Sequence, residues 1–233
     1  MAKVYLIAST PNALKVIASQ QLNMRGNMVK SVEEIADSDA ERLVLDVFKT
    51  NLSGALEFVD LVWNIEDITR GFSHQIVRYR VGTSFSQESM RFVNKTGFKY
   101  LVGKSIKTSE TKEKYDSMMK QISDCYQDLI EMGVETQDAR GVLPTNIFTK
   151  MGFKCTYRTL YNIAQTRLCL QAQEQEWRDV IGQMKKLVEE RVSPILADYL
   201  QPICYHSGVC EYGSIFDRSC PLQDKYPIKN RRL

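Results

Sequence analysis

The chain has 233 residues, of which 43% are hydrophobic and 25% are charged, and it contains 12 glycines and 6 prolines. A chain of this size and composition can bury one substantial core and leaves little room for long disordered linkers. The net charge of +3 is too small to indicate a nucleic-acid partner. No apolar stretch approaches the roughly 20 residues that span a bilayer. We therefore expect one main domain with neither a membrane nor a nucleic-acid partner.

The start of the chain and the cysteines bear on the cellular compartment. Residues 3–8 form a strand-like apolar segment, without the pattern of a signal peptide. We therefore expect a cytoplasmic protein whose six cysteines are reduced thiols. Cys125, Cys155 and Cys169 stand in helical or strand patterns that are typical of small core residues.

In chain order, the apolar patterns predict a strand over 3–8, a helix over 11–24, a helix over 31–50, a strand over 58–65, a helix-like segment over 68–77, a helix from 108 or 109 to 132, a strand over 148–157, and one helix or two in line over 158–190. We predict an α+β fold with a central sheet and long helices, in a single domain over 1–200. A short cysteine-containing tail over 201–233 follows this domain.

Several residues carry more specific signals of local structure. Ser31 opens the second predicted helix, and Glu34 follows it at the spacing of a capping box. Gly133 is predicted to end the helix that begins at 108 or 109. Trp63 and Trp177 stand in apolar or amphipathic contexts and are interpreted as packing residues. Six apolar residues of the helix before Gly133 recur at helical spacing and predict a core-facing stripe: Tyr115, Met118, Ile122, Cys125, Leu129 and Met132.

The tail contains a group of potential metal ligands, namely Cys204, His206, Cys210 and Cys220. Thiolate and imidazole groups are the usual zinc ligands in proteins. The spacing of the four residues nevertheless lacks the paired C-x-x-C knuckles of a strong zinc motif. We therefore predict no metal and interpret the tail as structural.

The run from Arg78 to Arg91 is the most informative stretch, because Arg78, Arg80 and Arg91 bracket a segment rich in hydroxyl and amide side chains. Arginine pairs twice with an oxyanion through its planar fork of donors, so this composition suits a phosphate group. The run lacks the glycine pattern of a P-loop or of a Rossmann fingerprint. The alternative is a solvated arginine-rich strand and loop, and composition alone leaves both interpretations open.

Two segments of this region, 72–80 and 84–91, resemble the signature of the flavin-dependent thymidylate synthases. That signature is Arg-His-Arg, followed by a short spacer and Ser-x-Arg. Two further segments, 139–146 and 158–173, are similar to the family at the expected order and distance. The resemblance spans most of residues 55–180.

The resemblance implies a site for dUMP, a site for FAD, and a homotetramer whose active sites gather residues from several subunits. The nucleotide would be surrounded by Gln75, Gln87, Ser89, Arg91, Arg140 and Arg167. The flavin would be held by Arg78, Tyr79, Arg80, Arg158 and Asn162. Within these sets, the resemblance implies that Arg91 and Arg140 hold the phosphate and that Arg167 lies along the pyrimidine edge. Methylenetetrahydrofolate and NADPH would be the co-substrates.

The chain also departs from the family pattern. Tyr79 stands where the family has histidine, and the spacer before Ser89 is one residue longer than the commonest form. Phe58 and Gln171 replace two further family histidines. The lost histidines lie near the flavin or folate region in the family, so the nucleotide pocket is better kept than the cofactor pocket.

The predicted helix from residue 158 presents arginines in two directions. At about 100° per residue, Arg158 and Asn162 share a face, whereas Arg167 falls roughly opposite Arg158. An oligomer that builds its site between subunits can use both faces. The alternative is that one of these arginines makes an ordinary surface salt bridge, for example with Glu174 or Glu176.

Arg167 is our candidate catalytic residue, because a fixed arginine beside a pyrimidine carbonyl stabilises the negative charge that develops on the ring. The two histidines, His74 and His206, do not adjoin a cysteine in the matched region, which argues against activation by a cysteine thiolate. Three functions remain: conversion of dUMP to dTMP, a different C5 modification such as hydroxymethylation, or nucleotide binding without catalysis. We favour the first, because most of the polar ligands survive.

Overall fold

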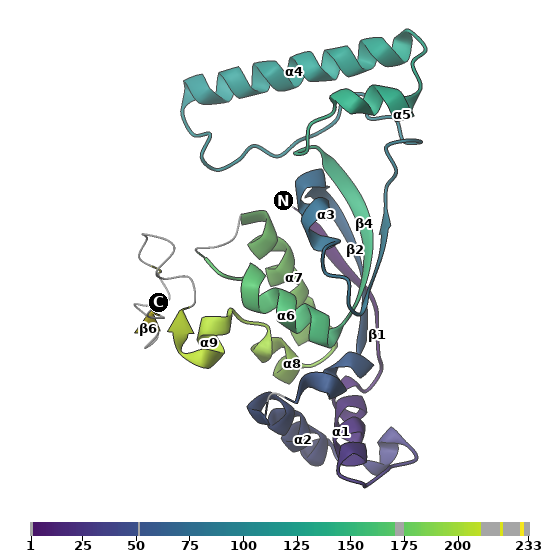
Figure 1. Cartoon of the computed structure of the whole chain (residues 1–233), viewed down its shortest axis with the longest axis vertical. Coiled ribbons are helices and arrows are strands. Elements are labelled where there is room, and N and C mark those ends of the chain that lie inside the picture. The colour runs from purple at the N-terminus through teal and green to yellow at the C-terminus, as the bar shows by residue number, and fades with distance from the viewer. Residues whose placement is uncertain (1, 51, 171–174, 211–219, 221–228, 231–233) are drawn as a thin grey trace. The chain divides into compact units, whose positions relative to one another are not determined.

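The computed structural model describes residues 2–50, 52–170, 175–210, 220 and 229–230 (Figure 1). A four-stranded sheet has the strand order β1-β2-β4-β3. Its strands are β1 Lys3–Ser9, β2 Asp60–Thr69, β3 Thr83–Gln87 and β4 Phe148–Thr156. The short strands β5 Val209–Cys210 and β6 Lys229–Asn230 pair in parallel. The mixture of one sheet and several helices confirms the predicted α+β class.

The helices of the described part of the chain are α1 Ala13–Met24, α2 Asp37–Thr50, α3 Arg70–Ile76, α4 Ser109–Glu131, α5 Thr136–Ala139, α6 Tyr157–Arg167, α7 Gln175–Arg191, α8 Pro194–Tyr199 and α9 Ile203–Ser207. Three short 3-10 helices are η1 Val32–Glu34, η2 Ser53–Phe58 and η3 Arg140–Val142. None of the described helices is both long enough and apolar enough to cross a membrane.

The central strands pair in antiparallel fashion. Backbone hydrogen bonds join Arg70 N to Ile147 O at 3.1 Å and Tyr157 N to Val59 O at 2.7 Å, which fixes the register of β2 against β4. Along both strands, buried and more exposed residues alternate. This period of two places one face of each strand in the core.

The described residues divide into two compact units. The first unit comprises those within 1–64, 79–84 and 153–233, and the second comprises 65–78 and 85–152. The divisions fall inside β2, β3 and β4, so these strands contribute to both units. Our prediction of one domain over 1–200 and a tail over 201–233 stays a prediction.

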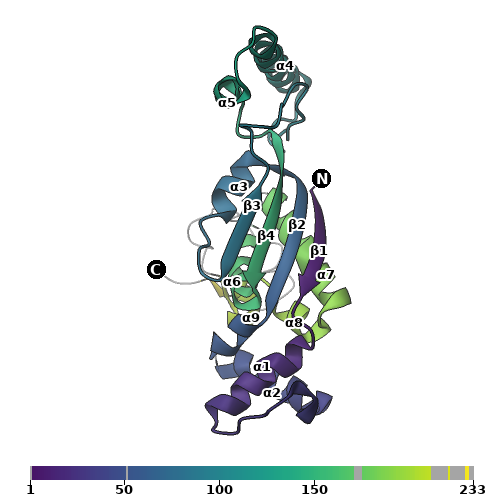
Figure 2. The same cartoon turned by 90° about the vertical axis from the view of Figure 1, so that its right-hand side faces the viewer.

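The first unit packs α7 against β1 and α8 (Figure 2). Trp177 of α7 and Trp63 of β2 are fully buried, which confirms their packing role. The hydroxyl of buried Tyr157 donates to the Leu196 carbonyl at 2.6 Å and joins the start of α6 to α8. The interior of this unit is therefore built from large side chains of one strand and three helices.

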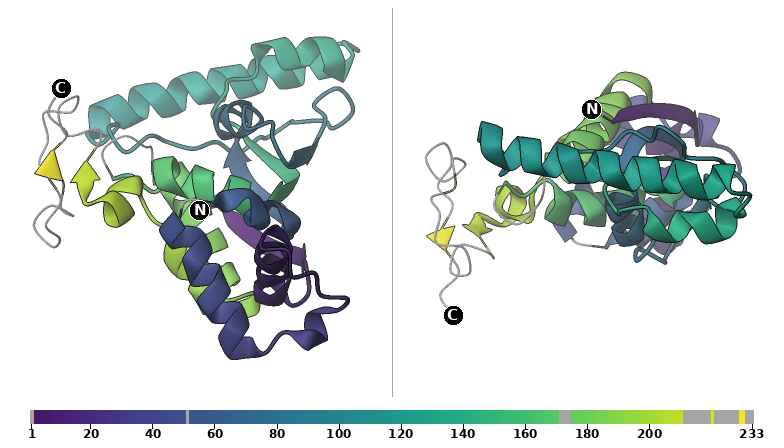
Figure 3. Two further views of the ribbon diagram at one scale, coloured as in Figure 1. Left: turned by 60° about the horizontal axis from the view of Figure 1, so that its bottom comes forward. Right: turned by 90° about the horizontal axis from the view of Figure 1, so that it is seen from above.

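In the second unit, α4 is one long helix, as Figure 3 shows from two sides. The Thr108 side chain accepts a hydrogen bond from Thr111 N, which confirms the predicted helix start. The prediction of a core-facing stripe is wrong in part, because Met118, Cys125 and Met132 are exposed. The buried positions of α4 are Met119 and Tyr126. The helix therefore buries a narrower face, one residue further round, than its apolar pattern indicates.

Two other predicted helices are interrupted. Ser31 caps only η1, and the Glu34 carboxylate accepts from Lys30 N rather than closing a capping box, so the predicted helix over 31–50 begins instead at Asp37. The predicted helix over 158–190 consists of α6, which ends at Arg167, and α7.

Candidate functional site

A polar cluster in the second unit begins where β2 meets α3. Thr69 ends the strand, and its hydroxyl accepts a hydrogen bond from Phe72 N at 2.9 Å, which caps the helix. Arg70 is therefore the first residue of α3. Its Nε is buried and has no hydrogen-bond partner among the described residues. Burial lowers the pKa of Arg70, and the positive charge of Arg140 lowers it further, which shows that the two guanidinium groups lie near each other.

Gln87 occupies the floor of the same cluster. Its Nε2 donates to Ser73 Oγ at 2.8 Å and to Thr149 Oγ1 at 3.5 Å. Thr149 in turn donates to the Glu88 carboxylate at 3.4 Å, and Lys95 pairs with that carboxylate at 2.6 Å. The chain of hydrogen bonds therefore orients the predicted ligand Gln87 before any nucleotide binds.

Gln137 joins the two predicted phosphate ligands. Arg91 donates through Nη2 to Gln137 Oε1 at 3.3 Å, and Arg140 donates through Nε to the Gln137 carbonyl at 3.0 Å. Thr136 donates to the Arg91 carbonyl, which ties the turn after β3 to α5. The structure thus brings Arg91 and Arg140 together, as their predicted common role requires.

The other predicted nucleotide ligands of this unit are placed less directly. Ser89 forms the turn after β3, where its Oγ accepts from Arg91 N at 3.3 Å. Gln75 lies half-buried on α3, and its carbonyl accepts from Arg78 N at 3.2 Å. Both residues belong to the unit that contains the polar cluster.

Arg167 lies in the first unit and has aromatic surroundings. Its Nε donates to the Tyr79 hydroxyl at 3.0 Å. The guanidinium carbon lies 4.0 Å from the centre of a Trp177 ring and 5.7 Å from the centre of the Tyr79 ring. An arginine over a tryptophan face at this distance makes a favourable cation–π contact. The predicted catalytic arginine is therefore held by two aromatic side chains.

The predicted flavin ligands lie on the surface. Arg158 pairs with Glu57 of η2, so the salt bridge considered for this helix exists, although its partner differs from those we named. Asn162 is exposed one turn further along α6. Arg78 and Arg80 are exposed as well. Arg158 and Arg167 contact different groups, which agrees with their predicted opposite directions. Gln171 lies outside the described residues.

Arg70 is the residue that sequence reasoning missed. It stands alone between the buried end of a strand and an apolar helix, so its surroundings in the sequence resemble those of an ordinary surface arginine. The available signal was its position directly after Thr69, a helix-capping residue type at the end of an apolar strand pattern. Proximity to Arg140 could not be read from a separation of 70 positions in the sequence.

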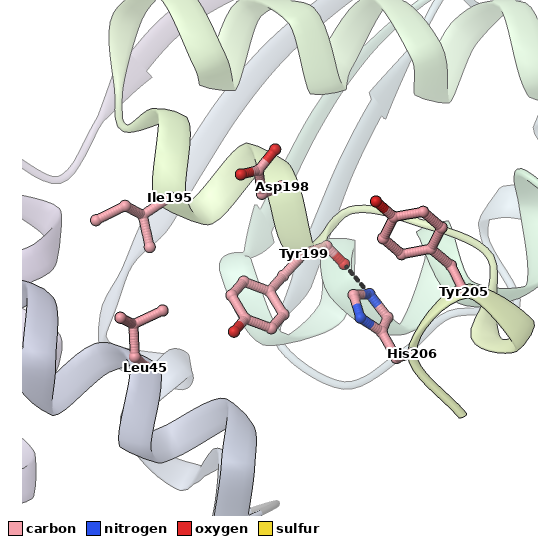
Figure 4. Close-up of a pocket in the computed structure, with 6 residues that line it drawn as sticks. All are labelled: Leu45, Ile195, Asp198, Tyr199, Tyr205 and His206. Atoms are coloured by element: carbon pink, nitrogen blue, oxygen red, sulfur yellow. Dashed lines mark hydrogen bonds between the residues drawn. The ribbon is translucent and has the colours of Figure 1, made fainter. Parts of the chain in front are cut away.

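A separate pocket of about 320 Å³ lies in the first unit and contains none of the predicted ligands (Figure 4). The Tyr199 ring stacks on Phe48 at 3.6 Å and lies 5.3 Å from the His206 ring. His206 Nε2 is 3.1 Å from the Tyr199 carbonyl oxygen. These contacts fix α9 against α8 and α2, and the residues lining the pocket are Leu45, Ile195, Asp198, Tyr199, Tyr205 and His206.

The cysteines are free thiols in different surroundings. Burial raises the pKa of Cys155 to about 12. Burial also raises the pKa of Cys204 to about 11, with smaller contributions from the other nearby cysteines of the first unit. These thiols are therefore protonated and unreactive at neutral pH. No group of three or more His, Cys, Asp or Glu side chains within the described ranges is arranged to hold a metal ion.

Comparison with known proteins adds independent findings. Residues 5–194 match the family model described as thymidylate synthase complementing protein. Three similar curated proteins are each named flavin-dependent thymidylate synthase. The protein of Saccharolobus solfataricus is 32% identical over 88% of this chain and 78% of its own length. The protein of Geobacter sulfurreducens is 30% identical over 91% and 92%, and that of Nitratidesulfovibrio vulgaris 28% over 97% and 96%, respectively.

Proposed function

Because the chain belongs to the thymidylate synthase complementing protein family, we propose that it is a flavin-dependent thymidylate synthase. In this proposal it transfers a one-carbon unit from methylenetetrahydrofolate to C5 of dUMP and forms dTMP. NADPH is the proposed source of reducing equivalents. Family membership gives the class of reaction, and the side chains of the two units support the individual roles.

The proposed phosphate site is the Arg70 and Arg140 pair, and this pair is the observation that carries the proposal. Two guanidinium groups close enough to lower a pKa repel each other, and the buried Arg70 Nε lacks a hydrogen-bond acceptor among the described residues. A phosphate dianion would relieve the repulsion and accept from that donor. Arg91 joins this set through Gln137. We propose that all three arginines hold the phosphate of dUMP.

The residues around this pair would orient the rest of the nucleotide. Gln87 is held by Ser73 and Thr149, so its amide is a preorganised polar contact for the nucleotide. We propose that Ser89 and Gln75 complete this set. In the first unit, Arg167 would stabilise negative charge on a carbonyl oxygen of the pyrimidine while C5 acts as a nucleophile. Its action there needs no proton transfer, because arginine stays charged.

The donor set of the first unit fits an anionic dinucleotide such as FAD. Arg80 and Asn162 are exposed, and the surface pair of Arg158 with Glu57 is of a kind worth only about 0 to 1 kcal/mol. An incoming diphosphate can therefore displace Glu57 at little cost. We propose that these residues, with Arg78 and Tyr79, hold FAD. When bound, FAD would supply the hydride that reduces the transferred one-carbon unit.

The exposed stripe of α4 supports the proposed homotetramer. Met118, Cys125 and Met132 follow one another at seven-residue spacing and are exposed in the single chain. Repeated apolar residues on one side of a helix are typical of a surface that packs against another helix. We propose that subunit assembly covers this stripe and that active sites draw residues from several subunits.

The test is a product assay with purified protein, FAD, NADPH, methylenetetrahydrofolate and dUMP tritiated at C5. We expect tritium release with formation of dTMP, identified by mass spectrometry. A hydroxymethyl product would support the alternative C5 modification. Binding of dUMP without tritium release would contradict catalysis and support a nucleotide-binding protein. Arg42→Gln, which alters an exposed arginine paired with Asp39, is the matched control for the arginine variants below.

A further inference from the structure

The Tyr79 hydroxyl, the Trp177 ring and the Arg167 guanidinium form one contact group in the first unit. The Nε bond to Tyr79 restrains the guanidinium from its edge, and the 4.0 Å contact with Trp177 restrains it from its face. Two restraints in different directions fix the plane of a group that otherwise rotates freely at the end of a long side chain. The Tyr79 and Trp177 rings are themselves in contact, with centres 6.4 Å apart and an edge-to-face angle of 68°.

The loop that carries Tyr79 is itself held firmly within the first unit. Thr83 Oγ1 donates to the Tyr79 carbonyl at 2.7 Å, and Thr159 Oγ1 donates to the Val81 carbonyl at 2.7 Å. Gly82 has a φ of 66°, and a Cβ at this position would lie 2.9 Å from the Thr156 side chain. Only glycine allows the loop to approach α6 this closely. Tyr79 therefore presents its hydroxyl from a fixed backbone.

We propose that Tyr79 is a positioning residue that orients Arg167 toward the pyrimidine, with Trp177 as the second restraint. This inference rests on the proposed function, because it assumes that Arg167 acts on the substrate ring. Tyrosine stands here where the family motif has histidine. The substitution therefore gives this chain a hydrogen-bond acceptor for Arg167 Nε. A preorganised guanidinium stabilises developing charge without having to reorient during the reaction.

Tyr79→Phe tests the proposal, because it removes only the hydroxyl and keeps the ring beside Trp177. We expect single-turnover methylation of dUMP to fall about tenfold, the size of a lost hydrogen bond to a charged group. We expect the affinity for dUMP and the FAD content to change less than about threefold, because the effect falls on the chemical step. Tyr5→Phe, which removes the hydroxyl of an exposed tyrosine on β1, is the control and should match the wild type.

A double-mutant cycle separates the failure of this inference from the failure of the proposed function. Once Arg167→Ala has removed the guanidinium, Tyr79→Phe should cause no further loss. If Arg167→Ala alone keeps the wild-type rate, the proposed role of Arg167 is wrong. If Arg167→Ala lowers the rate but Tyr79→Phe does not, or if the two losses simply multiply, the positioning role of Tyr79 is wrong.

A spectroscopic readout decides the orientation independently of turnover. Trp177 is one of two tryptophans, so protein labelled with 5-fluorotryptophan gives two fluorine resonances, and Trp177→Phe assigns them. We expect Arg167→Ala to displace the Trp177 resonance and Tyr79→Phe to displace it in the same direction, whereas Tyr5→Phe leaves it in place. Adding dUMP should displace it further, and adding ribose 5-phosphate should not. A Trp177 resonance unchanged by Tyr79→Phe would overturn the proposal.

Discussion

Arg70 and Arg167 are both buried in part and both assigned here to the substrate, yet their surroundings are opposite in kind. Arg70 has another guanidinium, Arg140, as its neighbour and a buried donor without a partner among the described residues. Arg167 has a hydroxyl and an aromatic face. Like charges held together are prepared for a full dianion, whereas an arginine satisfied by neutral groups is prepared for a charge that develops only during reaction.

This difference predicts separate losses on mutation. The second unit should control how tightly the nucleotide binds, because phosphate is charged in the ground state and the transition state alike. Arg167 in the first unit should control how fast the bound nucleotide reacts. The predictions below test that division, from the largest expected effect to the smallest.

The largest effect is expected from the phosphate arginines. Arg91→Gln, Arg140→Gln and Arg70→Gln should each weaken dUMP binding by about 2 to 4 kcal/mol, because each leaves a desolvated phosphate oxygen without its charged donor. Isothermal titration with dUMP gives the measurement, and Arg42→Gln should bind as the wild type does. If all three affinities stay within about threefold of wild type, the phosphate site is wrongly placed.

Arg167→Ala should lower single-turnover methylation by at least about a hundredfold, the effect of removing one preorganised electrostatic contact. Reduction of bound flavin by NADPH should continue, because that step does not involve the pyrimidine. Tritium release from C5 of dUMP reports the first step, and absorbance reports the second. A rate near that of the wild type would withdraw Arg167 from the mechanism and remove the contrast with Arg70.

Arg70→Met should raise the free energy of unfolding of the ligand-free protein by about 1 kcal/mol, because an apolar side chain replaces a poorly paired buried charge. Inorganic phosphate should then raise the melting temperature of the wild type and leave that of the variant unchanged. Denaturant titration and a thermal scan measure these two effects. A variant that is less stable than wild type and still responds to phosphate would show that Arg70 is a structural residue.

The smallest effect is expected at the proposed flavin site. Glu57→Gln removes the surface partner of Arg158 and should change the free energy of unfolding by less than about 1 kcal/mol. It should also strengthen FAD binding severalfold, because Arg158 no longer exchanges one anion for another. Glu66→Gln, which breaks the exposed pair with Lys150, is the control. Equal FAD affinities in both variants would argue against a flavin role for Arg158.

The sequence alone determined the features that depend on neighbouring residues. The period-two pattern of β4 predicted its strand, and the Thr108 position predicted the start of α4. The motif segments also identified the family and the arginine-rich run. Local patterns failed where packing decides: the apolar stripe of α4 did not show which of its residues would be buried, and Ser31 closed only a short 3-10 turn.

Tertiary structure alone decided which charged groups meet. Arg70 and Arg140 are 70 positions apart, and Tyr79 and Arg167 are 88 apart, so no local rule connects them. The sheet register brings the first pair together, and the glycine-dependent approach of the Tyr79 loop to α6 creates the second. Electrostatic and hydrogen-bond energies depend on distances of a few ångströms, which a sequence specifies only through the completed fold.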